Sequence, residues 1–257
     1  MRNILPHVRA KYGWKTDGYD ERDLTLPLAL TVTEPLPPSA DLRQLCPPVV
    51  DQGQLGSCTA NAIAGAMGFD QIKQALPVVP VSRLFIYANE RIAEGTPLTD
   101  DSGAQIRDGI KSVAKLGVCP ETEWPYVVDQ FSVKPPEQCY LAAKKDRAVV
   151  YQRVTQTLNQ LKACLASGWP FVFGFTVYES FESQAVADTG IVPMPLRGEQ
   201  IVGGHAVVAV GYTADGHFIV RNSWGDQWGQ SGYFLMPAAY LTNPKLASDI
   251  WQIKTIV

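Results

Sequence analysis

The chain has 257 residues, of which 46% are hydrophobic and 18% charged, and its formal net charge is −3. This composition fits a globular protein that buries a sizeable core as one large domain or two smaller ones. The basic residues are scattered, so charge gives no reason to expect a nucleic acid or an anionic surface as partner. No apolar run approaches the roughly 20 residues that cross a bilayer, and we therefore expect no membrane span.

Residues 1–37 are predicted to form an N-terminal extension. Charges and glycine interrupt residues 1–23, which lack the apolar stretch of about 7 to 15 residues typical of a secretory signal. We therefore expect a cytoplasmic location by default, or export by a route that leaves no signal here. Four prolines in residues 24–38 favour an extended connector.

The first half of the remaining chain has helical patterns. Small and apolar residues recur at helical spacing after Ser57, which predicts a helix buried on most sides with Ser57 as its N-cap and Cys58 in its first turn. Two more helices are predicted over residues 105–116, ended by Gly117, and over residues 158–166.

The second half has the pattern of a sheet. After Gly168 the runs PFVFGFTV, IVGGHAVVAVGY, HFIVRN and GYFLM are short, rich in Val, Phe and Tyr, and separated by turn residues. We expect an α+β protein with a helical subdomain over about residues 38–150 and a β-rich, barrel-like subdomain over residues 151–257. The boundary between such subdomains is a common place for a cleft.

A tight turn is predicted between two of these runs. Residues 213–216 end in Asp-Gly between alternating apolar segments, a strong hairpin signal. The hairpin would place Asn222 beside the strand that carries His205.

Cys58 is a candidate nucleophile because a helix N-terminus favours the thiolate. The alternative is a small buried residue without chemistry. The sequence has three histidines, and His7 lies in the extension while His217 adjoins the turn and is expected to be solvated. His205 follows two glycines, which let a ligand or backbone approach closely, and the amide of Asn222 could fix its tautomer.

Three segments together resemble the papain family of cysteine peptidases. They are DQGQLGSCTAN with Gln52 and Cys58, GGHAVVAVGY with His205, and IVRNSWGDQWGQSGYF with Asn222, in the order of the family. PPSADLRQLC and GVCPETEWPY are similar to further family segments, so the resemblance runs from about Pro38 to the end. It implies a two-subdomain fold with the active site between the subdomains.

The resemblance also implies a role for each matching residue. Cys58 would be the nucleophile of a thioester mechanism and His205 its acid and base, with Asn222 orienting His205 and Trp224 shielding their hydrogen bond. Gln52 and the backbone N–H of Cys58 would bind the oxyanion. No metal, cofactor or phosphate-binding motif is apparent, so none is expected.

The sequence departs from the family at three positions. Leu55 replaces a cysteine, Thr59 replaces an aromatic residue, and Gly204 replaces an aspartate that is auxiliary in papain. The disulfide built on that cysteine cannot form, and the pairing of Cys46, Cys119, Cys139 and Cys164 is left open. These changes indicate an outlying, bacterial-type branch with an altered pocket.

The resemblance further indicates a roomy substrate pocket. Gly103, Ala104, Gly174, Gly203 and Ala206 would surround it, with Gly204 and Trp224 adjoining; the alternative is that several of these residues only pack helices and strands. With so few histidines, we do not expect a dipeptide-releasing enzyme. We expect a monomeric endopeptidase that acts on peptides or proteins. The alternatives for the whole chain are an acyltransferase or amidase, and a catalytically silent binding protein.

The extension could run through or beside the cleft and keep the enzyme latent. The alternatives are a strap packed on the surface and a flexible tail.

Overall fold

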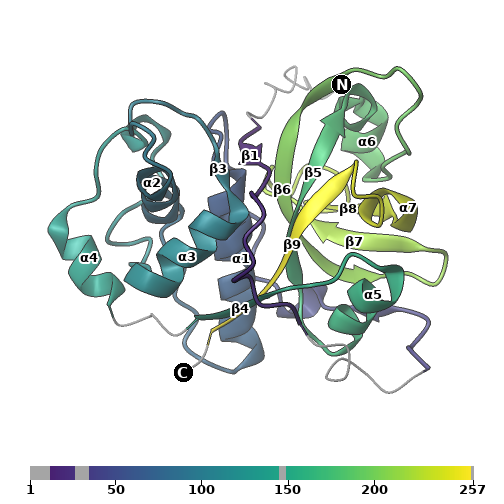
Figure 1. Ribbon diagram of the computed structural model, residues 1–257, viewed down its shortest axis with the longest axis horizontal. Coiled ribbons are helices and arrows are strands. Elements are labelled where there is room, and N and C mark those ends of the chain that lie inside the picture. Colours follow the sequence, from purple (N-terminus) through teal and green to yellow (C-terminus); the bar gives the residue numbers. More distant parts are fainter. Residues whose placement is uncertain (1–11, 27–34, 145–148, 256–257) are drawn as a thin grey trace.

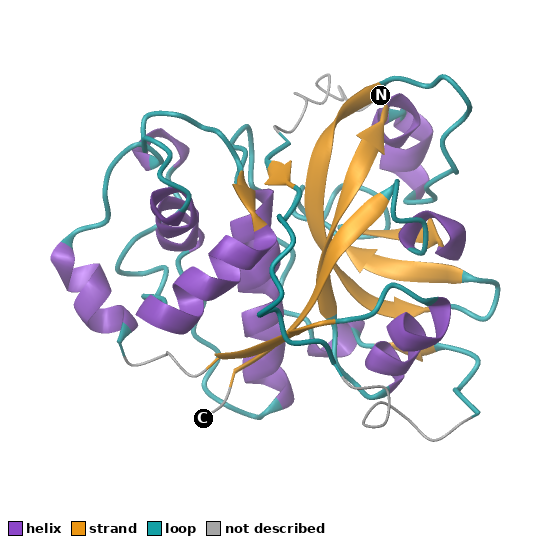
Figure 2. Cartoon of the chain, viewed as in Figure 1, coloured by secondary structure: helices purple, strands orange, loops and turns teal. Residues whose placement is uncertain are grey.

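The structure is a computed structural model, and it describes residues 12–26, 35–144 and 149–255. A helical half and a β-rich half lie side by side, as Figure 2 shows. Among the described residues, no helix combines the length and apolar character that crossing a membrane needs.

The helices follow the predicted pattern and add to it. The predicted helix after Ser57 is α1, the one before Gly117 is α3, and the one over residues 158–166 is α5. In chain order the helices are α1 (Cys58–Lys73), α2 (Arg83–Ala93), α3 (Ile106–Leu116), α4 (Glu137–Ala143), α5 (Leu158–Ala166), α6 (Gln184–Thr189) and α7 (Ala238–Leu241).

The strands of the second half form one antiparallel sheet. In the described part of the chain it has seven strands, in the order β4-β9-β5-β6-β7-β8, with β2 paired to β6. Counting β1 and β3, which form a separate two-stranded sheet, the described strands are β1 (Trp14–Lys15), β2 (Ala40–Asp41), β3 (Ala104–Gln105), β4 (Val149–Arg153), β5 (Phe171–Tyr178), β6 (Ile201–Tyr212), β7 (His217–Arg221), β8 (Tyr233–Pro237) and β9 (Ala247–Thr255).

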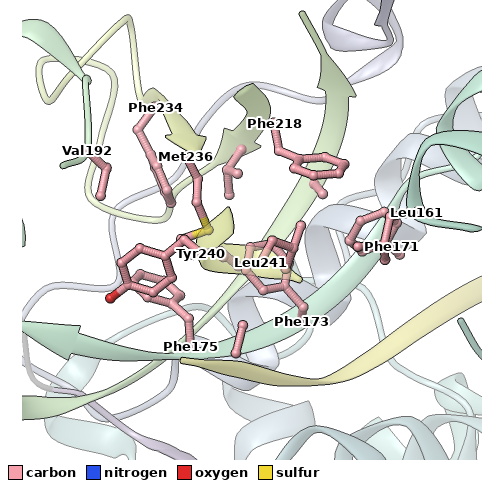
Figure 3. Close-up of a cluster of buried hydrophobic side chains, with 14 of the residues drawn as sticks. Leu161, Phe171, Phe173, Phe175, Val192, Phe218, Phe234, Met236, Tyr240 and Leu241 are labelled. Atoms are coloured by element: carbon pink, nitrogen blue, oxygen red, sulfur yellow. The ribbon is translucent and has the colours of Figure 1, made fainter. Parts of the chain in front are cut away.

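Both faces of this sheet are buried. On β5, Phe171, Phe173 and Phe175 point to one face and Val172 to the other, because successive side chains of a strand alternate. Helices α5 and α7 cover the first face, where Figure 3 shows an aromatic cluster between β5, β7 and β8. Helix α1 covers the second face against β6 and β9. The sheet therefore joins two cores, one in each half.

The described part of the extension crosses between the halves. We call residues 12–26 the N-terminal segment; Figure 1 shows it running between α1 and α3 on one side and β6 and β9 on the other. Trp14 and Lys15 form β1, which pairs in parallel with β3, and Thr25 forms a bridge with Arg153. Residues 27–34 of the predicted connector lie outside the described residues.

Candidate active site

Cys58 is the first residue of α1 and is completely buried. Ser57 occupies the N-cap position, but its side chain makes no cap hydrogen bond. Its Oγ instead lies 2.5 Å from the hydroxyl of Tyr126 and accepts from the amide of Asn61 at 3.0 Å. The predicted N-cap position of Ser57 is therefore confirmed, and its oxygen contacts Tyr126 and Asn61 rather than a backbone N–H of the helix.

The predicted hairpin brings Asn222 beside His205. Its turn closes with a 2.8 Å hydrogen bond from the backbone of Thr213 to His217, and Val208 of β6 pairs with Arg221 of β7. The next residue, Asn222, then reaches His205 with its side chain: Nε2 and Oδ1 are 2.8 Å apart.

This hydrogen bond defines the state of the imidazole. The Oδ1 of Asn222 also accepts the backbone N–H of Ser223 at 2.9 Å, which fixes the orientation of the amide. Since Oδ1 can only accept, Nε2 of His205 carries the proton and Nδ1 keeps its lone pair. That Nδ1 is buried and makes no hydrogen bond to the described residues. The ring of Trp224 stacks on the imidazole with centroids 5.0 Å apart and thereby shields the Asn222 contact.

Gln52 belongs to the same connected set. Its Oε1 accepts from the hydroxyl of Ser223 at 2.6 Å, and its Nε2 donates to the carbonyl of Leu55 at 2.9 Å. The backbone N–H of Gln52 donates to Ser223 at 2.9 Å. These contacts tie the loop before α1 to the residues after β7, so both halves hold the site together.

The departures from the family pattern have local explanations. Thr59 donates from its hydroxyl to the carboxyl of Glu90 at 2.6 Å, which places a buried polar pair where the family has an aromatic ring. Burial raises the pKa of Glu90 well above its ordinary value. Leu55 is buried, and none of the five cysteines is in a disulfide.

The N-terminal segment covers this site directly. Backbone groups of Gly13 and Ala206 hydrogen-bond the thiol of Cys58. Tyr12 lies with its ring centroid 5.8 Å from that of His205 and 6.0 Å from that of Trp224. A Cβ on Gly13 would lie 1.8 Å from the carbonyl oxygen of Gly56, so only glycine fits over the thiol.

The residues expected around the substrate pocket contact the same segment. The N–H of Ala104 donates to the carbonyl of Gly13 at 2.7 Å, and a Cβ on Gly103 would lie 2.0 Å from that carbonyl oxygen. The other glycines expected there meet the aromatic side chains of the segment. A Cβ on Gly203 would lie 2.7 Å from the side chain of Tyr12, whereas one on Gly174 or Gly204 would lie 1.9 Å or 2.8 Å from the ring of Trp14.

Burial determines protonation in this arrangement. It raises the pKa of Cys58 to about 11, although backbone hydrogen bonds oppose the shift. It lowers the pKa of His205 to about 4, although the hydrogen bond to Asn222 opposes that shift. The thiol and imidazole are therefore both neutral at pH 7 while the segment is in place. The thiolate predicted from the helix dipole alone is not favoured in this state, because burial outweighs the dipole.

Sequence reasoning missed a charged cluster beside the site. The side chain of Asp17 is buried, and its carboxyl accepts from the indole N–H of Trp251 at 2.8 Å and lies 3.2 Å from Arg153. The carboxyl of Asp249 accepts from the indole N–H of Trp14 at 3.1 Å and from the backbone N–H of Asp17 at 2.8 Å. No sequence motif includes these residues, so their contacts with one another appear only in the folded structure.

In the described residues, no group of three or more His, Cys, Asp and Glu side chains is placed to hold a metal ion. The site therefore combines the thiol of Cys58 with the imidazole of His205. Asn222 holds Nε2 of this imidazole, and Nδ1 is available for a proton.

Known proteins are similar to this chain in sequence. A family described as papain family cysteine protease matches residues 36–250. An uncharacterized peptidase C1-like protein of Acanthamoeba polyphaga mimivirus is 51% identical over 218 residues, which is 80% of this chain and 70% of that protein. Pro-cathepsin H of Mus musculus is 28% identical over 222 residues, 79% of this chain and 61% of its own length.

Solved structures agree with this assignment. Xylellain, a cysteine protease from Xylella fastidiosa, is similar with 46% identity and a TM-score of 0.89, covering 97% of this chain and 98% of that one. Digestive procathepsin L 3 of the Tenebrio molitor larval midgut is 19% identical with a TM-score of 0.61, covering 97% of this chain and 76% of that one, and supports the fold alone. The expected papain-like α+β fold is thereby confirmed, and the chain belongs to the papain family of cysteine proteases.

Proposed function

We propose that this cysteine protease hydrolyses internal peptide bonds of peptides or proteins through a thioester on Cys58. The observation that carries the proposal is the imidazole of His205, whose Nε2 is held by Asn222 at 2.8 Å while Nδ1 makes no hydrogen bond to the described residues. Such an imidazole accepts a proton at one defined atom. The thiol of Cys58, which contacts the backbone of the next residue, Ala206, would supply that proton.

The reaction uses Cys58, His205 and Gln52 once the N-terminal segment has left. Nδ1 of His205 takes the proton of the Cys58 thiol, and the thiolate attacks the carbonyl carbon of the substrate. The backbone N–H of Cys58 and the side-chain amide of Gln52 donate to the oxyanion. The C–N bond then breaks, and the amine leaves with the proton from His205. Water, deprotonated by His205, hydrolyses the thioester and regenerates the thiol.

Matched pairs of variants test these roles. Cys58→Ala should abolish hydrolysis of an internally quenched peptide, whereas Cys46→Ala, which changes a half-buried cysteine, should not. Gln52→Ala should lower kcat by roughly 100- to 1,000-fold, the effect of losing one oxyanion donor. Gln54→Ala, at an exposed position two residues away, is its control. Equal losses in Gln52→Ala and Gln54→Ala would refute the oxyanion role.

The proposal extends to the kind of cleavage. Endopeptidase action is supported by the position of His217, which lies at the turn next to Asp215 rather than beside His205. The peptide should therefore be cut when both of its ends are blocked. Products that appear only from peptides with free ends would contradict internal cleavage.

We also propose that residues 1–37 form a latency segment in front of a peptidase domain of residues 38–257. Support comes from the complete burial of Cys58 and from its contact with Gly13. Substrate cannot reach the thiol while this contact lasts. Deleting residues 1–34 should raise the hydrolysis rate, and an unchanged rate would refute latency.

A further inference from the structure

Two cysteines outside the candidate active site lie together in the helical half. Cys119 follows α3 and Cys139 belongs to α4, and their side chains form a hydrogen bond with each other. We propose that these two thiols are a cross-linking site, which a small-molecule disulfide such as oxidised glutathione converts to a Cys119–Cys139 disulfide bond. The proposal goes beyond the proposed function, because it assigns a covalent site to residues that take no part in hydrolysis.

The contact is particular to this pair of thiols. Cys58 lies under the N-terminal segment and contacts its backbone. Cys46 and Cys164 donate from their thiols to backbone carbonyls of their own neighbourhoods, at 3.7 Å and 3.5 Å. Of the pairings that the five cysteines allow, the fold therefore favours the one between Cys119 and Cys139.

Helix α2 positions both members of the pair. The backbone carbonyl of Cys119 accepts from the N–H of Ser82, the N-cap residue of α2, at 2.8 Å. Helix α4 packs on the same helix through Tyr140, whose hydroxyl donates to Asn89 at 3.0 Å and whose ring centroid lies 4.9 Å from that of Phe85. Both cysteines are completely buried. Contacts with one helix thus hold the two thiols against each other.

The cross-link forms in two exchange steps. The thiolate of one cysteine attacks a sulfur atom of oxidised glutathione, and one glutathione leaves as a thiolate. The thiolate of the other cysteine then attacks the protein sulfur of this mixed disulfide and expels the second glutathione. The two protein thiols are thereby oxidised by two electrons, oxidised glutathione is reduced to two molecules of glutathione, and the two thiol protons pass to the glutathione thiolates.

Burial determines when this exchange takes place. It raises the pKa of Cys119 to about 12 and also raises the pKa of Cys139, so thiolate is scarce once the chain has folded. We therefore expect the exchange while the chain folds, before α4 packs on α2. After folding, the same burial keeps reductants away from the bond, and the disulfide should resist reduction in the native protein.

The loop that the bond would close supports the candidate active site. It contains Tyr126, whose hydroxyl donates to the carbonyl of Gln52 at 2.9 Å and contacts the side chain of Ser57. A disulfide that closes about 20 residues restricts the unfolded chain and should raise Tm by roughly 4 to 16 °C in a protein of this size. The cross-link should therefore stabilise the helical half around the loop before α1.

Refolding followed by peptide mapping tests the proposal. The full chain with Cys58→Ala, which lacks the proposed nucleophile, is unfolded in urea and refolded in a mixture of reduced and oxidised glutathione. A glutamate-specific protease then cuts between the two cysteines, after Glu123 and Glu137, without prior reduction. Mass spectrometry should find the peptides of Cys119 and Cys139 linked, and Tm should exceed that of the same chain refolded with reduced glutathione alone.

Two results of this experiment would overturn the proposal. One is a map without the linked peptides of Cys119 and Cys139, which would mean that the two cysteines are packing residues only. The other is a linked chain whose Tm is no higher than that of the reduced chain. Neither readout involves hydrolysis, so the proposed function and the cross-link stand or fall separately.

Single variants assign the change in Tm to the pair. Cys139→Ala should abolish the difference in Tm between the oxidised and reduced chains. Cys164→Ala, which also removes a completely buried thiol, should keep this difference. An equal difference in both variants would contradict the assignment. The peptide map uses neither variant, so it tests the proposal even where Cys139→Ala does not fold.

Discussion

Two parts of the N-terminal segment are held by different forces. Residues 12–14 fit by shape, with Gly13 packed on Gly56 and the Trp14 indole lying against glycines of the sheet. Residues 17–23 carry the charged contacts: Arg153 lies 3.2 Å from Asp17 and 2.8 Å from Asp23. The part that covers Cys58 thus owes its fit mainly to close packing, with added hydrogen bonds from Tyr12 and Trp14 to carboxyl groups, and the part that anchors it has ion pairs that titrate. Changes in shape should open the site under all conditions, whereas changes in charge should alter the pH at which it opens.

The largest rise in hydrolysis rate is expected when a methyl group is added at Gly13, the residue packed on Gly56. In Gly13→Ala the Cβ would lie 1.8 Å from the carbonyl oxygen of Gly56, which the backbone cannot accommodate. Overpacking of this kind costs about 1–3 kcal/mol, so the hydrolysis rate of a small peptide should rise roughly 10- to 100-fold.

Gly18→Ala is the control within the same segment. Its Cβ would lie 3.8 Å from the guanidinium of Arg107, an ordinary contact. Its rate should stay close to that of the unchanged chain. A similar rise in both variants would mean that the close fit at Gly13 does not hold the segment in place.

Replacing Asp17 is expected to change the hydrolysis rate less, and by an amount that depends on pH. Burial and the neighbouring Asp249 raise its pKa from 3.8 to about 6, although the hydrogen bonds from Trp251 and Arg107 and the charge of Arg153 oppose the shift. A raised pKa means that protonation favours the docked state. Docking is therefore strongest below about pH 4 and weakens as the pH rises through about 6.

In Asp17→Asn the group at position 17 no longer titrates. The thiol of Cys58 and the imidazole of His205 still titrate, and they do so in both chains. The ratio of the unchanged chain's rate to that of Asp17→Asn should rise severalfold between pH 4 and pH 7. A ratio that is flat or falls over this range would show that Asp17 does not couple docking to pH.

The smallest effect is expected from the outer part of the charged anchor. Lys111 lies 3.3 Å from Asp20, and the lysine side chain is 38% exposed. Exposed ion pairs contribute little and are screened by salt. Lys111→Gln should therefore change the hydrolysis rate by no more than a few-fold. A rise as large as that of Gly13→Ala would remove the distinction between the two parts of the segment.

The sequence predicts the features that depend on local pattern. Helix α5, the strand of His205 and the hairpin before Asn222 follow from periodicity and from Asp-Gly at the turn. The three family segments likewise indicate Gln52, Cys58, His205 and Asn222, and the two glycines before His205 predict a close approach that Tyr12 and Trp14 make.

Features that arise only from distant packing escape the sequence. Helix α2 is a different case: it is not among the predicted helices, although its Arg, Leu, Ala and Glu residues favour a helix and Ser82 caps it by accepting from the N–H of Phe85. Asp249 joins Trp14 across 235 positions of sequence, so no spacing indicates their contact. The side-chain bond of Ser57 to Tyr126, which takes the place of the usual cap hydrogen bond, joins residues 69 positions apart.

The central claim is that a competent Cys58 lies beneath the N-terminal segment, and the rate at which an epoxide inhibitor of the E-64 type modifies this thiol tests it most directly. Mass spectrometry of digested protein locates the adduct in the unchanged chain, in Gly13→Ala and in Gly18→Ala. We predict an adduct on Cys58 that forms much faster in Gly13→Ala than in the other two chains. No adduct on Cys58 in any chain, or equal rates in all three, would contradict the account.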